Sequence, residues 1–246
     1  MQGLITLDFG NSHPHAGLFQ KNHDVWHLIK IVPWEELPLY LSQLEFTPNN
    51  SSLALCEVKA REEELLPYLQ QGFLITRVKD YWRGERFHGM PVHYSKSLGE
   101  DRLINAFHAW KKEKIPTLII DAGTFTTLDV ISETGYQGGY ILPGFRNYFS
   151  LFSQGEQLRD IHLTPTFNST LPQTTAQAMT DGYQAMGRLA QNLIKEQKIQ
   201  KIILTGGQGS IWSNLLLLKP DIKVENDPDY IHRAIHFWMT TQIEPL

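Results

Sequence analysis

The stretch LITLDFGNSH, residues 4–13, joins an apolar run to a carboxylate and a turn of small polar residues. The apolar run predicts a buried strand, and it ends at Asp8. The segment that follows, residues 9–12, has the composition of a tight turn. Two interpretations are open for this turn: an ordinary hairpin, or a loop that binds phosphate and a metal ion. One copy of the motif does not decide between them.

A second copy of the pattern lies near the middle of the chain, in TLIIDAGTFTTLDVI, residues 117–131. Asp8-Phe9-Gly10-Asn11 lines up with Asp121-Ala122-Gly123-Thr124. Backbone N–H groups in a tight turn suit phosphate oxygens, and glycine lets a ligand approach the backbone closely. A carboxylate can hold a hard cation, directly or through water. The recurrence therefore favours two loops that act on one polyphosphate over two unrelated hairpins.

The composition describes an ordinary globular protein of 246 residues with a formal net charge of −4. This charge gives no reason to expect a nucleic acid or an anionic membrane as partner. Cys56 is the single cysteine, so no intrachain disulfide or cysteine-rich zinc site is expected. We expect no membrane span, because no apolar stretch approaches about 20 residues. The first residues also lack a basic leader, so the expected location is the cytoplasm.

The remaining periodicity predicts alternating strands and helices. Strands are expected at 3–8, 14–19, 25–32, 51–57 and 73–78, and short helices at 34–45 and 60–70. A long loop is expected at 79–99, followed by an amphipathic helix at 100–113. The second half predicts a glycine-rich strand at 136–142, helices near 144–152, 173–196 and 209–216, and a strand at 201–205. Asp227 and Pro228 predict the N-cap and first position of a last helix with an apolar stripe.

Six motifs occur in a fixed order: DFGNSHPHAGLF (8–19), GEDRLINA (99–106), DAGTFTTLDV (121–130), GGYILPG (138–144), TTAQAMTDG (174–182) and TGG (205–207). Together they resemble the successive motifs of type III pantothenate kinase, a member of the actin–Hsp70–sugar kinase superfamily. The resemblance implies an α/β fold of two ribonuclease-H-like halves. Each half has a mixed sheet flanked by helices, and a central cleft holds the nucleotide. The halves are expected at 1–114 and 115–246, in a chain that forms a homodimer.

The resemblance also implies which residues bind ATP and metal ions. The ATP-binding set is Asp8, Phe9, Gly10, Asn11, Ser12, His13, Pro14, His15 and Thr124. Asp8 is expected to orient Mg²⁺ on the ATP phosphates. Asp121 is expected to bind a monovalent cation, K⁺ or NH₄⁺. The sequence SHPH after Asn11 is unusual, and its pattern alone does not explain it.

For the substrate, the resemblance implies that Asp101 is the general base and that Arg102 contacts pantothenate. The turn Gly99–Arg102, which includes Glu100, is expected to cradle pantothenate, with Tyr94 as a further contact. Thr175 is expected to reach the substrate from the other subunit of the homodimer. One departure affects Tyr94, because the segment from Tyr94 to Gly99 is two residues shorter than in the family and lacks its Asn-Pro.

The function implied is ATP-dependent phosphorylation of pantothenate to 4′-phosphopantothenate, the first step of coenzyme A biosynthesis. Two alternatives stay open because of the altered loop at 94–99. One is a kinase of the same superfamily that acts on a sugar or another hydroxy acid. The other is a nucleotide-binding accessory protein with little activity. Retention of Asp101 argues against the second, since a binding module has no need of a general base.

Overall fold

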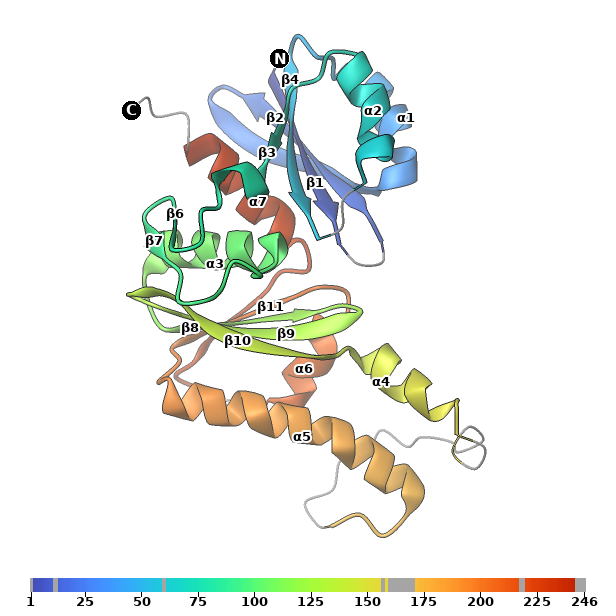
Figure 1. Cartoon of the computed structure of the whole chain (residues 1–246), viewed down its shortest axis with the longest axis vertical. Helices are drawn as coiled ribbons and strands as arrows, with labels where there is room; N and C mark the ends of the chain where they lie inside the picture. The colour runs from blue at the N-terminus through green and yellow to red at the C-terminus, as the bar shows by residue number, and fades with distance from the viewer. Residues whose placement is uncertain are drawn as a thin grey trace. The chain divides into compact units, whose positions relative to one another are not determined.

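The computed structural model describes residues 2–10, 13–58, 61–155, 158, 171–216 and 220–241 (Figure 1). It divides into two compact units, each described here by itself. Unit 1 comprises Met1–Glu113, Thr134–Tyr136 and Asp229–Leu246. Unit 2 comprises Lys114–Glu133 and Gln137–Pro228.

Unit 1 is built on a five-stranded sheet in the order β3-β2-β1-β4-β5. The strands are β1 (Gln2–Phe9), β2 (His15–Asn22), β3 (Val25–Pro33), β4 (Ser51–Glu57) and β5 (Ile75–Arg77). The first three strands form an antiparallel meander, whereas β1, β4 and β5 run parallel. The register sets Asp8 opposite His15 on one side and Cys56 on the other.

Alternation along β1 separates the core of unit 1 from its polar face. Ile5, Leu7 and Phe9 join the hydrophobic core under α1 (Leu37–Gln43) and α2 (Glu62–Gln70). Thr6 and Asp8 point the other way, and the Thr6 hydroxyl contacts a residue of α7 (Tyr230–Thr241). Helices α3 (Glu100–Glu113) and α7 pack against each other and against this side of the sheet (Figure 1). A short 3₁₀ helix, η1 (Trp34–Glu36), precedes α1. Between β5 and α3 lie η2 (Val78–Tyr81), β6 (Arg86–Phe87) and β7 (Met90–Pro91).

Unit 2 repeats the same sheet order, as β10-β9-β8-β11-β12. The strands are β8 (Thr117–Ala122), β9 (Phe125–Ser132), β10 (Gly135–Pro143), β11 (Lys201–Thr205) and β12 (Lys223–Asn226). The helices are α4 (Phe145–Phe152), α5 (Thr175–Glu196) and α6 (Gly209–Leu215). Here too the first strand is antiparallel to the second and parallel to the fourth. The predicted α/β fold of two similar halves with mixed sheets is confirmed, and the cleft between them stays a prediction.

The end of the chain differs from the sequence expectation. The last helix begins at Tyr230, so the predicted cap at Asp227 and Pro228 is wrong. The predicted apolar stripe is confirmed, since Tyr230, Ile231, Ala234, Ile235 and Trp238 are buried. This stripe packs on α3 and β1, so the segment from Asp229 belongs to unit 1. The expected halves, 1–114 and 115–246, place this segment in the second half instead. Among the described helices, none combines the length and the apolar character needed to cross a bilayer.

Candidate functional site

The first predicted loop begins where β1 ends. The Asp8 carboxylate is 14% exposed, and its Oδ2 lies 3.5 Å from Nε2 of His15, its partner across the β1–β2 pair. A Cβ on Gly10, two residues further along, would make only an ordinary van der Waals contact with the carboxylate, 3.8 Å from Asp8 Oδ1. Phe9 is buried edge-on against Trp34, so its side chain belongs to the core. Asn11 and Ser12 lie outside the described residues.

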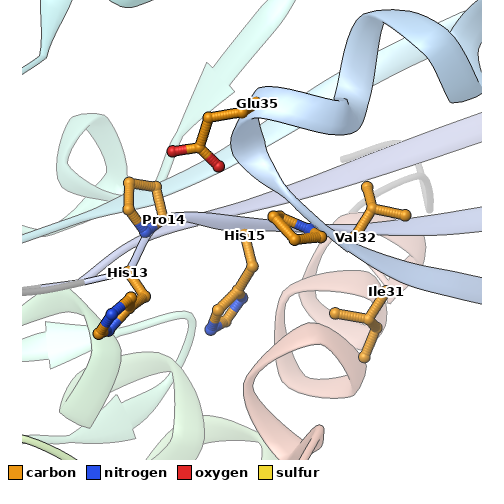
Figure 2. Close-up of a pocket in the computed structure, with 7 residues that line it drawn as sticks. His13, Pro14, His15, Ile31, Val32 and Glu35 are labelled. Atoms are coloured by element: carbon orange, nitrogen blue, oxygen red, sulfur yellow. The ribbon is translucent and has the colours of Figure 1, made fainter.

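Beside this loop lies a pocket of about 340 Å³, lined by His13, Pro14, His15, Ile31, Val32, Pro33 and Glu35 (Figure 2). In Figure 2 the imidazoles of His13 and His15 extend to the same side of the strand, and Glu35 approaches from the other side. The structure therefore brings the three predicted residues His13, Pro14 and His15 into the wall of one cavity. Most of the remaining wall is apolar.

Four carboxylates surround the thiol of Cys56 on β4. Burial raises the pKa of this thiol well above its usual value, and Asp8, Asp101, Glu100 and Glu57 raise it further. The expectation of a buried thiol is confirmed, because Cys56 is fully enclosed and protonated near neutral pH. The same interactions show that Asp8, from the first loop, and Asp101, from the GEDR motif, lie in one neighbourhood of unit 1.

Glu57 and Glu100 connect the sheet to the start of α3. The backbone N–H of Glu57, at the end of β4, donates to Oε2 of Glu100 over 3.2 Å. Arg77 donates to the Glu57 carboxylate over 3.1 Å, and Lys79 also pairs with it. Burial is the main cause that raises the pKa of Glu100 to about 7. The hydrogen bond from the Glu57 N–H and the charge of Lys79 lower this pKa, whereas the Glu57 carboxylate raises it. Glu57 was not among the predicted site residues, although it ends an apolar run just as Asp8 does.

Asp101 lies in the first turn of α3, half-buried. Its Oδ1 accepts a hydrogen bond from the backbone N–H of Arg102 over 2.8 Å. A Cβ on Gly99 would lie 2.5 Å from this same oxygen, so a larger residue at position 99 would displace the carboxylate. Gly99, the glycine of the GEDR motif, therefore allows the Asp101 carboxylate to occupy its observed position.

Arg102 lies between two tyrosines within unit 1. It donates to the hydroxyl of Tyr136 over 2.8 Å, and its guanidinium carbon lies 5.4 Å from the ring centre of Tyr94. The two rings are 5.9 Å apart and nearly perpendicular. The shortened loop thus still places Tyr94 against Arg102. Sequence reasoning missed Tyr136, because nothing in the glycine-rich run at 135–143 distinguishes this buried tyrosine from an ordinary strand residue.

The second predicted loop, in unit 2, is held through its backbone carbonyls, which accept from both backbone and side-chain donors. The carbonyl of Thr124 accepts hydrogen bonds from the Gly144 N–H over 3.0 Å and from the Asn147 side chain over 2.7 Å. Gln208 donates its backbone N–H to the Ala122 carbonyl and its side-chain amide to the Gly123 carbonyl.

The TGG motif completes this second loop. Gly206 has φ +77°, and a Cβ there would lie 2.7 Å from both the Ala122 carbonyl oxygen and Asp121 Oδ1. A side chain at position 206 would therefore clash with both oxygens, so only glycine is tolerated this close to Asp121 and Ala122. Elsewhere in unit 2, Thr175 is exposed in the first turn of α5, whose N-cap is Thr174.

The family model of type III pantothenate kinase matches residues 4–196. The chain belongs to the type III pantothenate kinase family. Among curated relatives, a type III pantothenate kinase of Streptomyces coelicolor is 33% identical over 237 residues, covering 83% of this chain and 86% of its own. A second, from Desulfosudis oleivorans, is 27% identical over 225 residues, covering 83% and 87%. As a member of this family, the chain is a kinase.

Solved structures agree in fold. A Campylobacter jejuni protein assigned to the Baf family of transcriptional activators has a TM-score of 0.62 at 22% identity, covering 97% of this chain and 98% of its own. A Sinorhizobium meliloti protein assigned as a 2-dehydro-3-deoxygalactonokinase has a TM-score of 0.54 at 12% identity, covering 99% and 100%. At these identities the likeness concerns the fold alone, and it agrees with the α/β architecture described above.

Proposed function

We propose that the chain transfers the γ-phosphoryl group of ATP to pantothenate, giving 4′-phosphopantothenate for coenzyme A biosynthesis. The observation that carries the proposal is the placement of Asp8 and Asp101 around Cys56 in a chain of this family. Phosphoryl transfer depends mainly on positioning and on charge stabilisation. A carboxylate that orients Mg²⁺ on the phosphates, with a second carboxylate in the same neighbourhood to receive a proton, would meet both needs.

Asp101 is the general base in this proposal. It would accept a hydrogen bond from the primary hydroxyl of pantothenate and take its proton as the new bond to phosphorus forms. Its Oδ1 accepts the backbone N–H of Arg102, which restrains the orientation of the carboxylate at the start of α3. Glu100 and Gly99 act on Asp101 indirectly: Glu100 fixes the start of α3 to β4, and Gly99 leaves the carboxylate its space.

Arg102 and Tyr94 are the proposed contacts for the carboxylate and amide of pantothenate. The planar guanidinium matches a carboxylate with two parallel donors. Its hydrogen bond to Tyr136 and its packing on Tyr94 support this role, because both restrict the side chain to one orientation before the substrate binds. Less conformational entropy is then lost on binding.

ATP is proposed to bind the two loops, through residues 8–15 of the first and Thr124 of the second. Asp8 fits Mg²⁺, because its carboxylate is a hard oxygen ligand beside the first loop. Within the described residues no cluster of three or more metal-ligating side chains occurs, which suits an ion that keeps most of its waters. When bound with ATP, Mg²⁺ would neutralise charge on the phosphate oxygens.

A monovalent cation, K⁺ or NH₄⁺, is proposed to bind at Asp121. The proximity of Asp121 Oδ1 and the Ala122 carbonyl oxygen to each other beside Gly206 supports it. Both oxygens are hard ligands, and one is neutral, which suits an ion of single charge.

The working form is proposed to be a homodimer in the cytoplasm, with Thr175 reaching the substrate of the other subunit. Exposed apolar side chains in unit 2, among them Tyr140, Ile141 and Leu151, support an interface there. The exposure of Thr175 itself is also consistent with a role toward a second copy.

One assay tests the reaction. Purified protein is mixed with ATP, Mg²⁺ and K⁺, and ADP release is measured with pantothenate, with a panel of sugars, and with neither. Release that depends on pantothenate is expected. Release that depends only on a sugar, or nucleotide binding without any turnover, would overturn the proposal in favour of another small-molecule kinase or an accessory protein. Replacing K⁺ by Na⁺ is expected to lower the rate, and full activity in Na⁺ alone would remove Asp121 from its proposed role.

A further inference from the structure

The tip of the β9–β10 hairpin, Thr134–Tyr136, belongs to unit 1, although most of both strands belongs to unit 2. This hairpin tip pairs with the segment that leads from β7 into the substrate loop, residues 94–99. Val92 and Tyr136 form a parallel β-bridge, and the His93 N–H donates to the Tyr136 carbonyl over 2.9 Å. Nε2 of His93 also lies 3.3 Å from the carbonyl oxygen of Thr134. The main chain just ahead of the substrate loop is thus held by the hairpin tip.

Gly135 allows this close approach. It has φ +105°, a conformation that residues with a side chain rarely adopt, and a Cβ there would lie 2.1 Å from the Pro91 carbonyl oxygen. Only glycine therefore lets the hairpin tip lie against the end of β7. A second support comes from the chain just before β6, where the Glu85 carbonyl accepts the Val92 N–H over 2.9 Å. The segment 91–93 is thus fixed through its backbone by two neighbouring parts of unit 1.

The side chain of Tyr136 connects the hairpin tip to both proposed substrate contacts. It is fully enclosed, and its hydroxyl accepts a hydrogen bond from Arg102 over 2.8 Å. Its ring centre lies 5.9 Å from that of Tyr94, with the planes 76° apart, an edge-to-face arrangement that aromatic pairs prefer. The Tyr94 ring in turn lies 5.4 Å from the guanidinium carbon of Arg102. One buried residue therefore contacts both groups and sets the distance between them.

The substrate loop itself is a short local turn. The Leu98 N–H donates to the Ser95 carbonyl over 3.2 Å, and the hydroxyls of Ser95 and Ser97 lie 2.6 Å apart. Residues 95–97 are exposed, whereas Leu98 is buried. These hydrogen bonds join residues within the turn, so we infer that the position of Tyr94 depends on the segment before it and on the hairpin tip.

We propose that Tyr136 is a positioning residue for pantothenate, and that the hairpin tip makes up for the two residues missing from the substrate loop. The tip holds the Tyr94 ring against the Arg102 guanidinium before the substrate binds, so less conformational entropy is lost on binding. The inference rests on the proposed function, since it uses the assignment of Tyr94 and Arg102 to pantothenate. It predicts an effect on substrate affinity, because the tip acts through the two groups that bind the substrate in this proposal.

The first test is Tyr136→Phe, which removes the hydroxyl and keeps the ring. Loss of a hydrogen bond to a charged group is expected to raise KM for pantothenate about 10-fold, while kcat and KM for ATP stay unchanged. The control is Tyr81→Phe, at a tyrosine of η2 that is 43% exposed, which should leave all three constants unchanged. An unchanged KM for pantothenate in Tyr136→Phe would overturn the proposal, whatever happens to kcat.

A double-mutant cycle shows whether the effect runs through Arg102. In an Arg102→Lys background the hydrogen bond to Tyr136 is already lost, so adding Tyr136→Phe should change KM for pantothenate less than about 2-fold. Increases in KM that multiply in the double variant would mean that Tyr136 acts independently of Arg102, which would contradict the proposal.

Gly135→Ala tests the main-chain contact. Its Cβ would push the hairpin tip away from Pro91, so KM for pantothenate should rise by at least about 10-fold. Gly89→Ala is the matched control, because Gly89 also has a positive φ, +84°, but a Cβ there meets nothing within 4 Å. Thermal unfolding should show strain in both variants, and only Gly135→Ala should change KM. Equal KM values would overturn the role of the hairpin tip, and Tyr136→Phe decides the proposal if Gly135→Ala does not fold.

A measurement without pantothenate separates this inference from the proposed function. The order parameter of the Arg102 side chain, from ¹⁵Nε relaxation, is expected to be high in the unmodified protein and in Tyr81→Phe, and lower in Tyr136→Phe. Equal order in Tyr136→Phe and the unmodified protein would overturn the positioning role. If the order parameters are as expected but pantothenate is not phosphorylated, the proposed substrate is rejected and the positioning of Arg102 by Tyr136 stands.

Discussion

The loops that follow β1 and β8 have the same sequence pattern and the same place in two equivalent sheets, yet different groups hold them. Around Asp8 the neighbours are side chains that can titrate: His15 next to it, and three further carboxylates at Cys56. In the loop after β8, the backbone carbonyls of Ala122 and Gly123 accept hydrogen bonds from Gln208. The two loops therefore share the same strand-and-turn backbone, and the groups around them differ.

This difference has a physical basis in the ions the two loops are proposed to bind. A small divalent cation keeps its waters and is held through a few charged groups and their hydrogen bonds. A larger monovalent cation needs oxygen atoms at fixed positions, which a rigid backbone supplies. The first loop should accordingly respond to changes in side-chain chemistry, and the second to changes in backbone geometry.

The largest effect is expected at Asp101, in the side-chain cluster of the first unit. Asp101→Asn keeps the size and one acceptor of the side chain but removes the base, so kcat should fall by about 10²–10⁴-fold while ATP still binds. Steady-state kinetics with pantothenate, together with an ATP-binding titration, measures both quantities. The control is Asp24→Asn, at a side chain that is 94% exposed. A kcat near normal would remove Asp101 from the base role.

Next is the backbone of the second loop, tested by Gly206→Ala. Because Gly206 has φ +77° and its Cβ would press on the Ala122 carbonyl, we expect strain of about 1–2 kcal/mol and a clear loss of activation by K⁺. Thermal unfolding and the rate as a function of K⁺ concentration measure the two effects. Gly207→Ala is the matched control, since a Cβ at Gly207 meets nothing within 4 Å. Similar behaviour of both variants would contradict a backbone-built cation site.

A smaller effect is expected from Arg102→Lys. The charge remains, but the planar pair of donors and the bond to Tyr136 are lost, so KM for pantothenate should rise by about 10-fold with little change in kcat. The exposed Arg83 gives the control Arg83→Lys. If the KM for pantothenate is the same in Arg102→Lys and the unmodified protein, the guanidinium does not bind this substrate.

The smallest effect concerns the dependence of stability on pH. Burial raises the pKa of Glu100 from 4.5 to about 7, so between these values the folded chain holds a proton that the unfolded chain has released. The contribution of Glu100 to stability is therefore complete below pH 4.5 and is lost as the pH rises through 7. Glu100→Gln should reduce the stability difference between pH 5 and pH 8 by on the order of 1–3 kcal/mol.

Urea unfolding at the two pH values measures this difference, and Glu63→Gln, at an exposed residue of α2, is the control. An unchanged difference between pH 5 and pH 8 in Glu100→Gln would show that Glu100 ionises normally. It would also weaken the interpretation that this carboxylate fixes the start of α3 to β4.

Sequence reasoning succeeded where a structure depends on neighbours along the chain. The strand that ends at Asp8, the strand that ends at Asp121 and the helix that begins near Asp101 each follow from local periodicity and composition. It was wrong at the start of the last helix, where Asp227 and Pro228 have the right chemistry but the helix begins at Tyr230. Packing of the apolar stripe set that boundary, and a cap preference worth about 1 kcal/mol did not.

By itself, the sequence determined the repeated strand, carboxylate and turn, the α/β class and the family, because each is written in residues close together in the chain. Only the tertiary structure decided which distant side chains complete the sites. Glu57 meets Glu100 across 43 positions, Arg102 meets Tyr136 across 34, and His15 meets His232 across 217. No periodicity links such positions. For Glu57–Glu100 and His15–His232, it is the packing of α3 and α7 on the first sheet that brings the partners within hydrogen-bond distance.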